Sequence, residues 1–511
     1  MNIIEHNREK INGVFETFDR MIVNGYILQL CNYQQFLYYL IQNNVMLKDF
    51  NTFASGQTDL LCRHIEAYIK DNGVTLKYLD SGKLDKNELA RNEFEANPLK
   101  TGQVAAFSVV ELCNTMTVKP NKASQHLEVA SRSTKCKHYY FYYNDAEFGW
   151  MFLKIQTWFP YNVQIYMNGR EYASRLLSKN NVLYEMYNNS FSYIGDFNKA
   201  QELADGILDN KISDSFDGMI NKINCLLPAI KEVFHHSYYW CVDQCEFATD
   251  INFKSREDLS AFYKTLVETS FFTFSSNDVY SFFGRKLDRI DSFKGEIVSD
   301  LRHRYQGYRI KFKMNNNQVK MYDKGNNLRI EVTINNPKDF KILKTIESIS
   351  NGQFVQTKKW VPMGKSISNL YRYIEISRAI TKRFIEALPT VGFDKTPVKE
   401  IESASASKNV DGKRYSGFNL LSMDNSCLLR AIASGDFLIS GFDNKSIRAR
   451  IFENPDCQKA INKTTRLFSR LKAHGLIKKV PKKNRYYLTA RGRSITNAVL
   501  LFINKELLNA A

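Results

Sequence analysis

The sequence predicts an α+β protein of several domains, with a central mixed or antiparallel sheet that has a basic open face and a small C-terminal domain. Three observations support this. The 511 residues are enough for two to four domains. Hydrophobic residues make up 44% and charged residues 24%, a balance typical of globular chains. Aromatic and β-branched runs alternate with stretches of helical periodicity, which is typical of a chain that mixes strands and helices.

Residues 1–75 are predicted to form an N-terminal helical region, because apolar residues such as Phe15, Phe18 and Ile22 recur at three- and four-residue spacing. Residues 76–235 are predicted to be an α+β domain. Its strands are expected in the aromatic-rich stretches 104–113, 138–143, 150–159 and 161–167, and helices are expected to follow.

Residues 236–400 are predicted to be the central sheet domain, with a strand, a helix and then a three-stranded meander over 308–334. The polar, small-residue stretch 401–416 is predicted to be a linker. Residues 417–511 form the predicted C-terminal domain. The meander shows strict alternation, so one face is expected to be apolar and the other polar.

The net charge of +18 is concentrated in two segments. Residues 441–511 hold 16 Lys and Arg against 4 Asp and Glu, and residues 301–329 hold 8 against 1. The rest of the chain is close to neutral. Because a neutral body with basic segments is typical of a polyanion binder, we expect a nucleic-acid partner. No long apolar run or leader-like N-terminus is present, so no membrane contact and a cytoplasmic location are expected.

The C-terminal domain has the pattern of three helices followed by a hairpin, which is the order of a winged helix. Its third helix, expected from Asp456 or Gln458 to His474, has one apolar side and one cationic side. The helix and the following turn are predicted to bind duplex DNA, by major-groove docking with backbone contacts. The alternative is a solvated basic face on a winged helix that binds protein. The predicted DNA contacts are Lys459, Lys463, Arg466, Arg470, Lys478, Lys479, Lys482, Lys483 and Arg485.

The segment LKAHGLIKKVPKKNRYYLT within this domain resembles the recognition helix and wing of MarR-type winged-helix regulators. The resemblance is confined to the C-terminal domain, where it implies a winged-helix fold. It also leaves open a transcriptional regulator whose large N-terminal region senses a ligand or partner.

The polar face of the meander is predicted to hold a second strand of DNA, with RNA left open as an alternative. We expect Lys313 to pair with Lys320, Lys311 with Tyr322, Lys320 with Glu331, and Tyr322 with Arg329. Tyr322 would then stack on a base or act as a nucleophile with a lowered pKa. A solvated face is the other alternative. The predicted contacts here are Arg309, Lys311, Lys313, Lys320 and Arg329.

A metal-dependent nuclease or nicking enzyme of replication or transposition is the rival hypothesis. Asp250 and Glu331 on neighbouring strands would hold Mg²⁺ or Mn²⁺, and Tyr322 would join them as a catalytic residue. Nine cysteines lack zinc-site spacing; Cys241 and Cys245 have three residues between them, so free thiols are expected.

Two further resemblances arise from these residues. QTWFPYNVQIYMNGREY, FGRKL, KMYDKGNNLRIEVTINNP and the C-terminal domain together resemble a family of large bacterial proteins without an assigned activity. YDK followed by LRIEV is similar to a strand pair in filamentous-phage-type rolling-circle replication proteins, although their His–hydrophobic–His motif is absent here. Both resemblances imply a bacterial, phage or mobile-element system.

Overall fold

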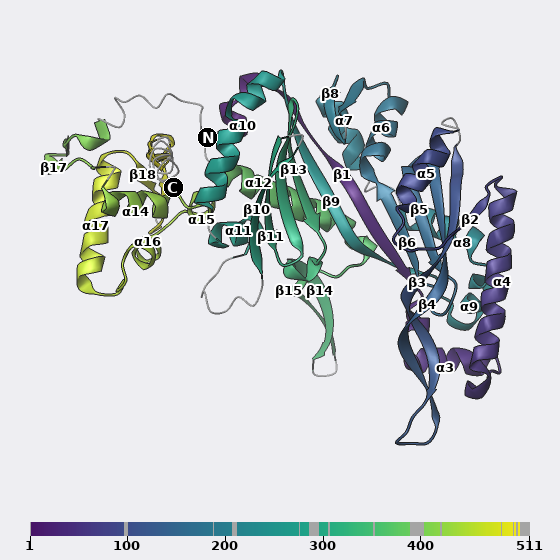
Figure 1. The fold of residues 1–511 in the computed structure, drawn as a ribbon. Coiled ribbons are helices and arrows are strands. Elements are labelled where there is room, and N and C mark those ends of the chain that lie inside the picture. The colour runs from purple at the N-terminus through teal and green to yellow at the C-terminus, as the bar shows by residue number, and fades with distance from the viewer. Residues whose placement is uncertain are drawn as a thin grey trace.

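The computed structural model shows an α+β protein in which one large sheet forms the body and a small helical domain lies at one end (Figure 1). In the described residues, no helix is both long and apolar enough to span a membrane. The structure describes residues 2–96, 101–187, 189–206, 212–274, 276–285, 296–304, 307–350, 353–388, 403–419, 422–481, 483–493, 495–496 and 499–500.

The body is built on an eleven-stranded sheet in which every neighbouring pair is antiparallel except β2 and β3. The sheet continues across the predicted boundaries at 75/76 and 235/236. Its strands in spatial order are β10 (Ile297–Arg304), β11 (Gly307–Met314), β12 (Asn317–Lys324), β13 (Asn327–Ile334), β9 (Tyr239–Phe253), β1 (Ile11–Tyr26), β6 (Val163–Asn168), β5 (Gly149–Gln156), β4 (Leu127–Asp145), β3 (Gly102–Pro120) and β2 (Leu76–Leu79).

Strand β1 corrects the prediction that the N-terminal region, residues 1–75, is helical throughout. Phe15, Phe18 and Ile22 have helical spacing, yet they lie on a strand between β6 and β9. The register of β1 against β9 shifts between Phe18 and Arg20. Because this bulge changes which residues face the core, the apolar spacing over the strand departs from two and imitates a helix. The predicted strands within 104–167 are confirmed as β3 to β6.

The meander is confirmed, with one correction to its register. Residues of its predicted apolar face, from Ile310 to Ile334, are buried. Lys320 lies opposite Glu331 and Tyr322 opposite Arg329, as expected. Between β11 and β12, however, Lys311 pairs with Lys320, and Tyr322 pairs with Arg309. The turn is tighter than predicted because Asn317 begins β12, which moves the register by two residues.

Helices cover both faces of the sheet. Helices α4, α8, α9, α10 and α12 contribute to the main apolar core on one face, whereas α5, α6 and α7 pack on the other. The body helices are α1 (Ile3–His6), α2 (Leu28–Cys31), α3 (Tyr33–Gln42), α4 (Phe50–Asp71), α5 (Lys86–Glu95), α6 (Gly169–Lys179), α7 (Phe197–Asp205), α8 (Ile212–Ile223), α9 (Leu227–Phe234), α10 (Arg256–Thr273), α11 (Ser276–Phe282) and α12 (Leu370–Ala387).

Two hairpins, β7–β8 (Tyr184–Tyr187, Ser190–Ile194) and β14–β15 (Lys341–Ser350, Gln353–Pro362), form separate two-stranded sheets. Short 3₁₀ segments at Arg8–Lys10, Leu47–Asp49, Pro337–Asp339 and Ile367–Asn369 connect elements of the body.

The C-terminal domain has helices followed by a hairpin, as predicted, but four described helices precede the hairpin instead of the predicted three, because residues 435–440 form a short helix. The domain has its own apolar core. Within the segment predicted as a linker, β16 pairs with β17, and Ala404 is buried in this core together with Phe418 just beyond it. The elements are β16 (Lys408–Val410), β17 (Lys413–Tyr415), α14 (Met423–Ile432), α15 (Gly435–Ser440), α16 (Asn444–Ile451), α17 (Gln458–Ala473), β18 (Ile477–Lys479) and β19 (Tyr486–Leu488).

Candidate functional site

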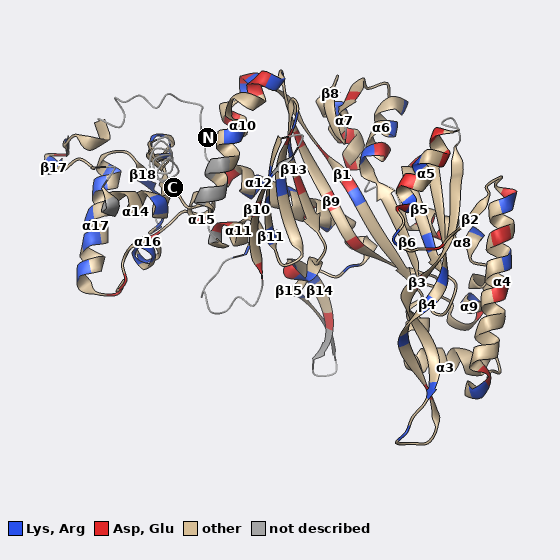
Figure 2. Cartoon of the chain, viewed as in Figure 1, with Lys and Arg blue, Asp and Glu red and all other residues tan. Residues whose placement is uncertain are grey.

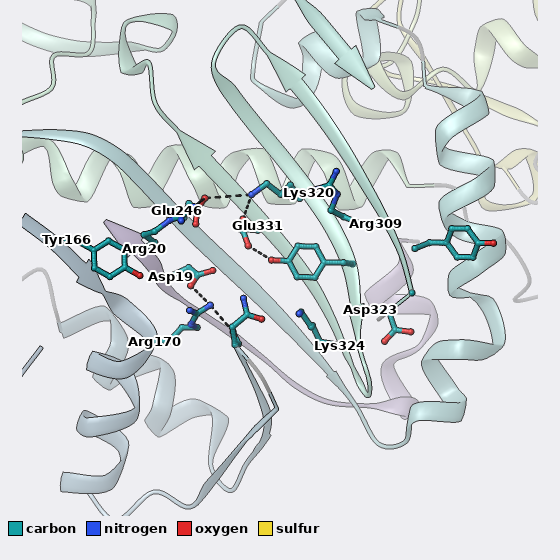
Figure 3. A pocket seen from close by; sticks show the side chains of 14 residues that line it. Asp19, Arg20, Tyr166, Arg170, Glu246, Arg309, Lys320, Asp323, Lys324 and Glu331 are labelled. Atoms are coloured by element: carbon teal, nitrogen blue, oxygen red, sulfur yellow. Dashed lines mark hydrogen bonds and ion pairs between the residues drawn. The ribbon is translucent and has the colours of Figure 1, made fainter. Parts of the chain in front are cut away.

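A polar pocket of about 270 Å³ opens on the sheet face that carries α6 (Figure 3). Its walls come from β1, β6, β9, β11, β12 and β13, with α6 and the turn of the β7–β8 hairpin at one side. The pocket therefore lies on the polar face of the meander that the sequence singled out. It is lined by Asp19, Arg20, Tyr166, Arg170, Asn189, Glu246, Gly307, Tyr308, Arg309, Lys320, Tyr322, Asp323, Lys324 and Glu331.

The bulge in β1 brings into this pocket two charged residues that the sequence analysis missed. Consecutive residues of a regular strand point to opposite faces. Here the shift between Phe18 and Arg20 lets Asp19 and Arg20 both line the pocket. The only signal in the sequence is the adjacent pair of opposite charges between the apolar residues Phe18 and Met21, and the helical interpretation of residues 1–75 concealed it.

Arg329 of β13 links that strand to β9 and β1 of the same sheet, at the floor of the pocket. Its side chain is 0% exposed. One terminal nitrogen donates to both carboxylate oxygens of Asp250 at 3.0 Å, and the other donates to Asp19 at 2.5 Å. Asp19 also pairs with Arg170 of α6 at 2.5 Å. Arg329 was predicted to contact nucleic acid; the structure corrects this, because its guanidinium is enclosed by carboxylates.

A second group of charges lies beside Arg329. Lys320 is 2.5 Å from a carboxylate oxygen of Glu331 and 3.7 Å from one of Glu246. Glu246 is also 2.6 Å from Arg20. Burial alone would raise the pKa of Glu331, but Lys320 and Arg329 more than offset this and lower that pKa to about 2. The floor of the pocket is thus a compact network in which each carboxylate is paired with an arginine or lysine side chain.

Tyr322 does not have the lowered pKa that a tyrosine nucleophile needs. Its hydroxyl donates a hydrogen bond to Glu331. Burial of the phenol and the neighbouring Glu331 carboxylate raise the pKa of Tyr322 well above its ordinary value. Arg329 does lower the pKa of Tyr322, as expected for a nearby cation, but burial and the Glu331 carboxylate outweigh that effect.

Asp250 and Glu331 do not form the predicted metal pair. Burial raises the pKa of Asp250, and its two oxygens are held by Arg329, whose Nε lies 3.9 Å from Glu331. The three carboxylates whose oxygens lie within 4.8 Å of one another are instead Asp19, Glu246 and Glu331. A divalent cation such as Mg²⁺ or Mn²⁺ would have to compete there with arginine and lysine side chains already in contact, so this trio is a poor metal site.

The other predicted contacts on the meander are also paired with acids. Arg309 is 2.6 Å and Lys311 3.5 Å from the same oxygen of Asp300. Lys313 is 3.0 Å from Glu296. Asp300 lies on β10 and Glu296 directly precedes it, and β10 was not among the strands predicted from the sequence. The cationic face is therefore largely neutralised by its own neighbours.

Lys and Arg residues recur along α17 and the elements beside it in the C-terminal domain (Figure 2), and several of their side chains are exposed. Along α17, Lys459, Lys463 and Arg466 are exposed, while Ala460, Thr464, Phe468 and Leu471 are buried. The cationic side predicted for this helix thus faces solvent. In and beside the β18–β19 hairpin, three further predicted contacts are exposed: Lys478, Lys479 and Lys483. Lys482 lies outside the described residues.

Two predicted DNA contacts have a different role. Arg470 donates 2.9 Å to the carbonyl of Ser416 and also bonds the carbonyl of Gly417, and its guanidinium lies 3.9 Å from the ring centre of Phe418. Arg485 donates 2.7 Å to the carbonyl of Ser440. These half-buried arginines hold segments of the domain together, so the exposed cationic surface is narrower than predicted.

A third cluster is formed by Cys113 on β3 and by Cys136 and His138 on β4. The two sulfurs are 2.9 Å apart, and Nδ1 of His138 lies 4.0 Å from Cys136 Sγ. A hydrogen bond from Cys136, with His138 nearby, lowers the pKa of Cys113 to about 5. The two cysteines are too far apart in the sequence to match a metal-site spacing, so only the strand register reveals the cluster.

Comparisons with protein-family models, curated proteins and solved structures find no match to this chain.

Proposed function

We propose that this protein binds duplex DNA through α17 and the β18–β19 hairpin. One observation carries the proposal: Lys459, Lys463 and Arg466 form an exposed stripe on a helix whose opposite side is buried in the domain core. Such a helix fits the major groove, and the neighbouring hairpin lysines suit the flanking phosphates. The order of elements, with a recognition helix followed by a wing, supports the same assignment.

The charge of this surface supports a polyanion over a neutral protein partner. An exposed cation on a helix is ordinary, but the three cations of the α17 stripe and the three exposed lysines of the adjoining hairpin repel one another at low salt. A phosphate backbone relieves that repulsion and releases condensed counterions, which makes binding favourable and strongly salt-dependent. The central pocket is not part of this proposal, since its charges already satisfy one another.

The test is a titration of labelled duplex DNA with the full chain over a range of salt concentrations. Lys463→Ala combined with Arg466→Ala should weaken binding and flatten the slope of log K against log salt by about 2, since each phosphate contact contributes about 0.9. Lys472→Ala is the matched control, because Lys472 is exposed on α17 but lies about 140° away from the stripe. Unchanged affinity and slope in the double variant would overturn the proposal, and duplex RNA in parallel distinguishes the two nucleic acids.

A further inference from the structure

The β14–β15 hairpin is an isolated two-stranded ribbon that projects from the body (Figure 1). Ten residues of β14 pair with ten residues of β15, from Lys341 opposite Pro362 to Ser350 opposite Gln353. Neither strand joins another strand of the described residues. A two-stranded ribbon is marginally stable by itself, because it has no sheet face on which to bury apolar side chains.

Each face of the ribbon carries side chains whose placement in water costs free energy. On one face Lys344 lies directly opposite Lys359, and both are exposed. Like charges opposite one another destabilise a strand pair. On the other face Trp360 lies opposite Leu343, and these side chains are 66% and 43% exposed. An anionic partner offsets the repulsion between the two lysines, and contact with it takes the apolar side chains of Trp360 and Leu343 out of water.

The charge of the ribbon indicates the class of partner. Between residues 341 and 362 there are four lysines and one acid, Glu347. The lysines occupy both strands and both faces, so a polyanion that encloses the ribbon fits better than one that touches a single side. The major groove of B-DNA is about 12 Å wide and admits a two-stranded ribbon, with phosphates on either side. Ten residues of strand span about 33 Å, close to one turn of the duplex.

We propose that the β14–β15 ribbon is a second duplex-DNA contact, which enters a groove and places Lys344 and Lys359 on flanking phosphates. This inference rests on the proposed function, but it uses different residues from α17. Trp360 then lies against the groove wall or a sugar and leaves contact with water.

The first measurement is the same salt-dependent titration of duplex DNA, with Lys344→Ala combined with Lys359→Ala. Loss of two phosphate contacts should weaken binding roughly ten- to a hundred-fold at 0.1 M salt and flatten the salt slope by about 2. The double replacement by arginine should keep both values. Lys48→Ala with Lys70→Ala is the matched control, because both lysines are exposed around α4 at the far end of the body.

A second measurement reports on the ribbon itself. Of the four tryptophans, Trp150 and Trp240 are almost fully buried, Trp158 is half-buried and Trp360 is exposed. Iodide should therefore quench mainly Trp360, and the difference between the native chain and Trp360→Phe isolates its emission. Duplex DNA should protect that emission from iodide. Equal quenching with and without saturating DNA would overturn the proposal.

The outcomes separate this inference from the proposed function. Full affinity in the ribbon variant, with loss in the α17 variant, would overturn the ribbon contact and leave the function. Loss in the ribbon variant alone would support the ribbon and remove α17 from the interface. Ribbon-dependent binding to phosphatidylserine vesicles, without an effect on DNA, would identify the ribbon as a lipid contact and overturn the inference.

Discussion

The hydroxyl of Tyr322 on β12 donates a hydrogen bond to Glu331 on β13, and the antiparallel pairing of these two strands brings the side chains together. Burial of the phenol raises its pKa, and the carboxylate raises it further, because removing the proton would place two anions side by side. The sequence suggested that Tyr322 is activated as a nucleophile. In the structure its surroundings instead hold Tyr322 in the protonated form.

This relationship predicts how Tyr322 titrates. In an alkaline titration followed by phenolate absorbance, Tyr322→Phe should give the same curve as the native protein up to about pH 10, since the pKa of Tyr322 is raised. A phenolate signal below pH 9 that the variant lacks would contradict the assignment. The same variant should retain duplex-DNA affinity, which binding measurements can check in parallel.

Removing Arg329 should destabilise the body severely. Arg329→Ala leaves Asp250 and Asp19, which are 2% and 3% exposed, without a shared cation. Breaking a buried ion pair in this way costs about 3–5 kcal/mol. Urea denaturation followed by far-ultraviolet circular dichroism measures the loss. Arg302→Ala, at a side chain that is 60% exposed, is the control and should change stability by less than about 0.5 kcal/mol. A loss below about 1 kcal/mol for Arg329→Ala would contradict the role of the network.

The low pKa of Glu331 predicts a contribution to acid stability. A carboxyl whose pKa falls to about 2 on folding stabilises the native state above its unfolded pKa of about 4.3, and this contribution is lost as the pH falls toward 2. Glu331→Gln should therefore be less stable at pH 7 and should lose less stability than the native protein between pH 4.5 and 2. Glu347→Gln, at an exposed position on the ribbon, is the control. Parallel pH profiles for the native chain and Glu331→Gln would contradict the prediction.

Cys113 should be the most reactive thiol at mildly acidic pH. With a pKa of about 5, it is largely thiolate at pH 6, whereas burial raises the pKa of Cys62, Cys225 and Cys241. Alkylation by iodoacetamide at pH 6, read by peptide mass spectrometry, should label Cys113 first. Cys136→Ala should slow this labelling, since it removes the hydrogen bond that stabilises the thiolate. Preferential labelling of Cys62, Cys225 or Cys241 would contradict the assignment.

Local periodicity was sufficient for much of the fold. The strands within 104–167, the meander and the helix of residues 458–473 all have alternation or helical spacing that survives in the structure. Strand β1 could not be assigned in this way, because its bulge removes the period of two on which strand prediction depends.

The chemistry of the site was less accessible from the sequence. Glu331 and Tyr322 lie beside each other as the pairing of β12 with β13 predicted. Their neighbour Arg329 is held by an ion pair with Asp19, which is 310 residues away along the chain. Likewise, the cations of the meander looked unpaired because Asp300 and Glu296 belong to a strand region that periodicity did not reveal. The charge of a pocket depends on ion pairs between residues that are far apart in the sequence, and a single sequence does not show those pairs.

The position of β1 between β6 and β9 has a consequence for biosynthesis. Strands β1 to β6 are contiguous in the sheet and are complete once Asn168 has been synthesised, whereas β9 begins at Tyr239. During translation this half of the sheet can assemble early and leave β1 as an open edge until β9 leaves the ribosome. At about 5–20 residues per second, the interval lasts several seconds. An exposed edge strand invites pairing with other chains, and Asp19 and Arg20, which both line the pocket in the finished fold, place charge on that temporary edge.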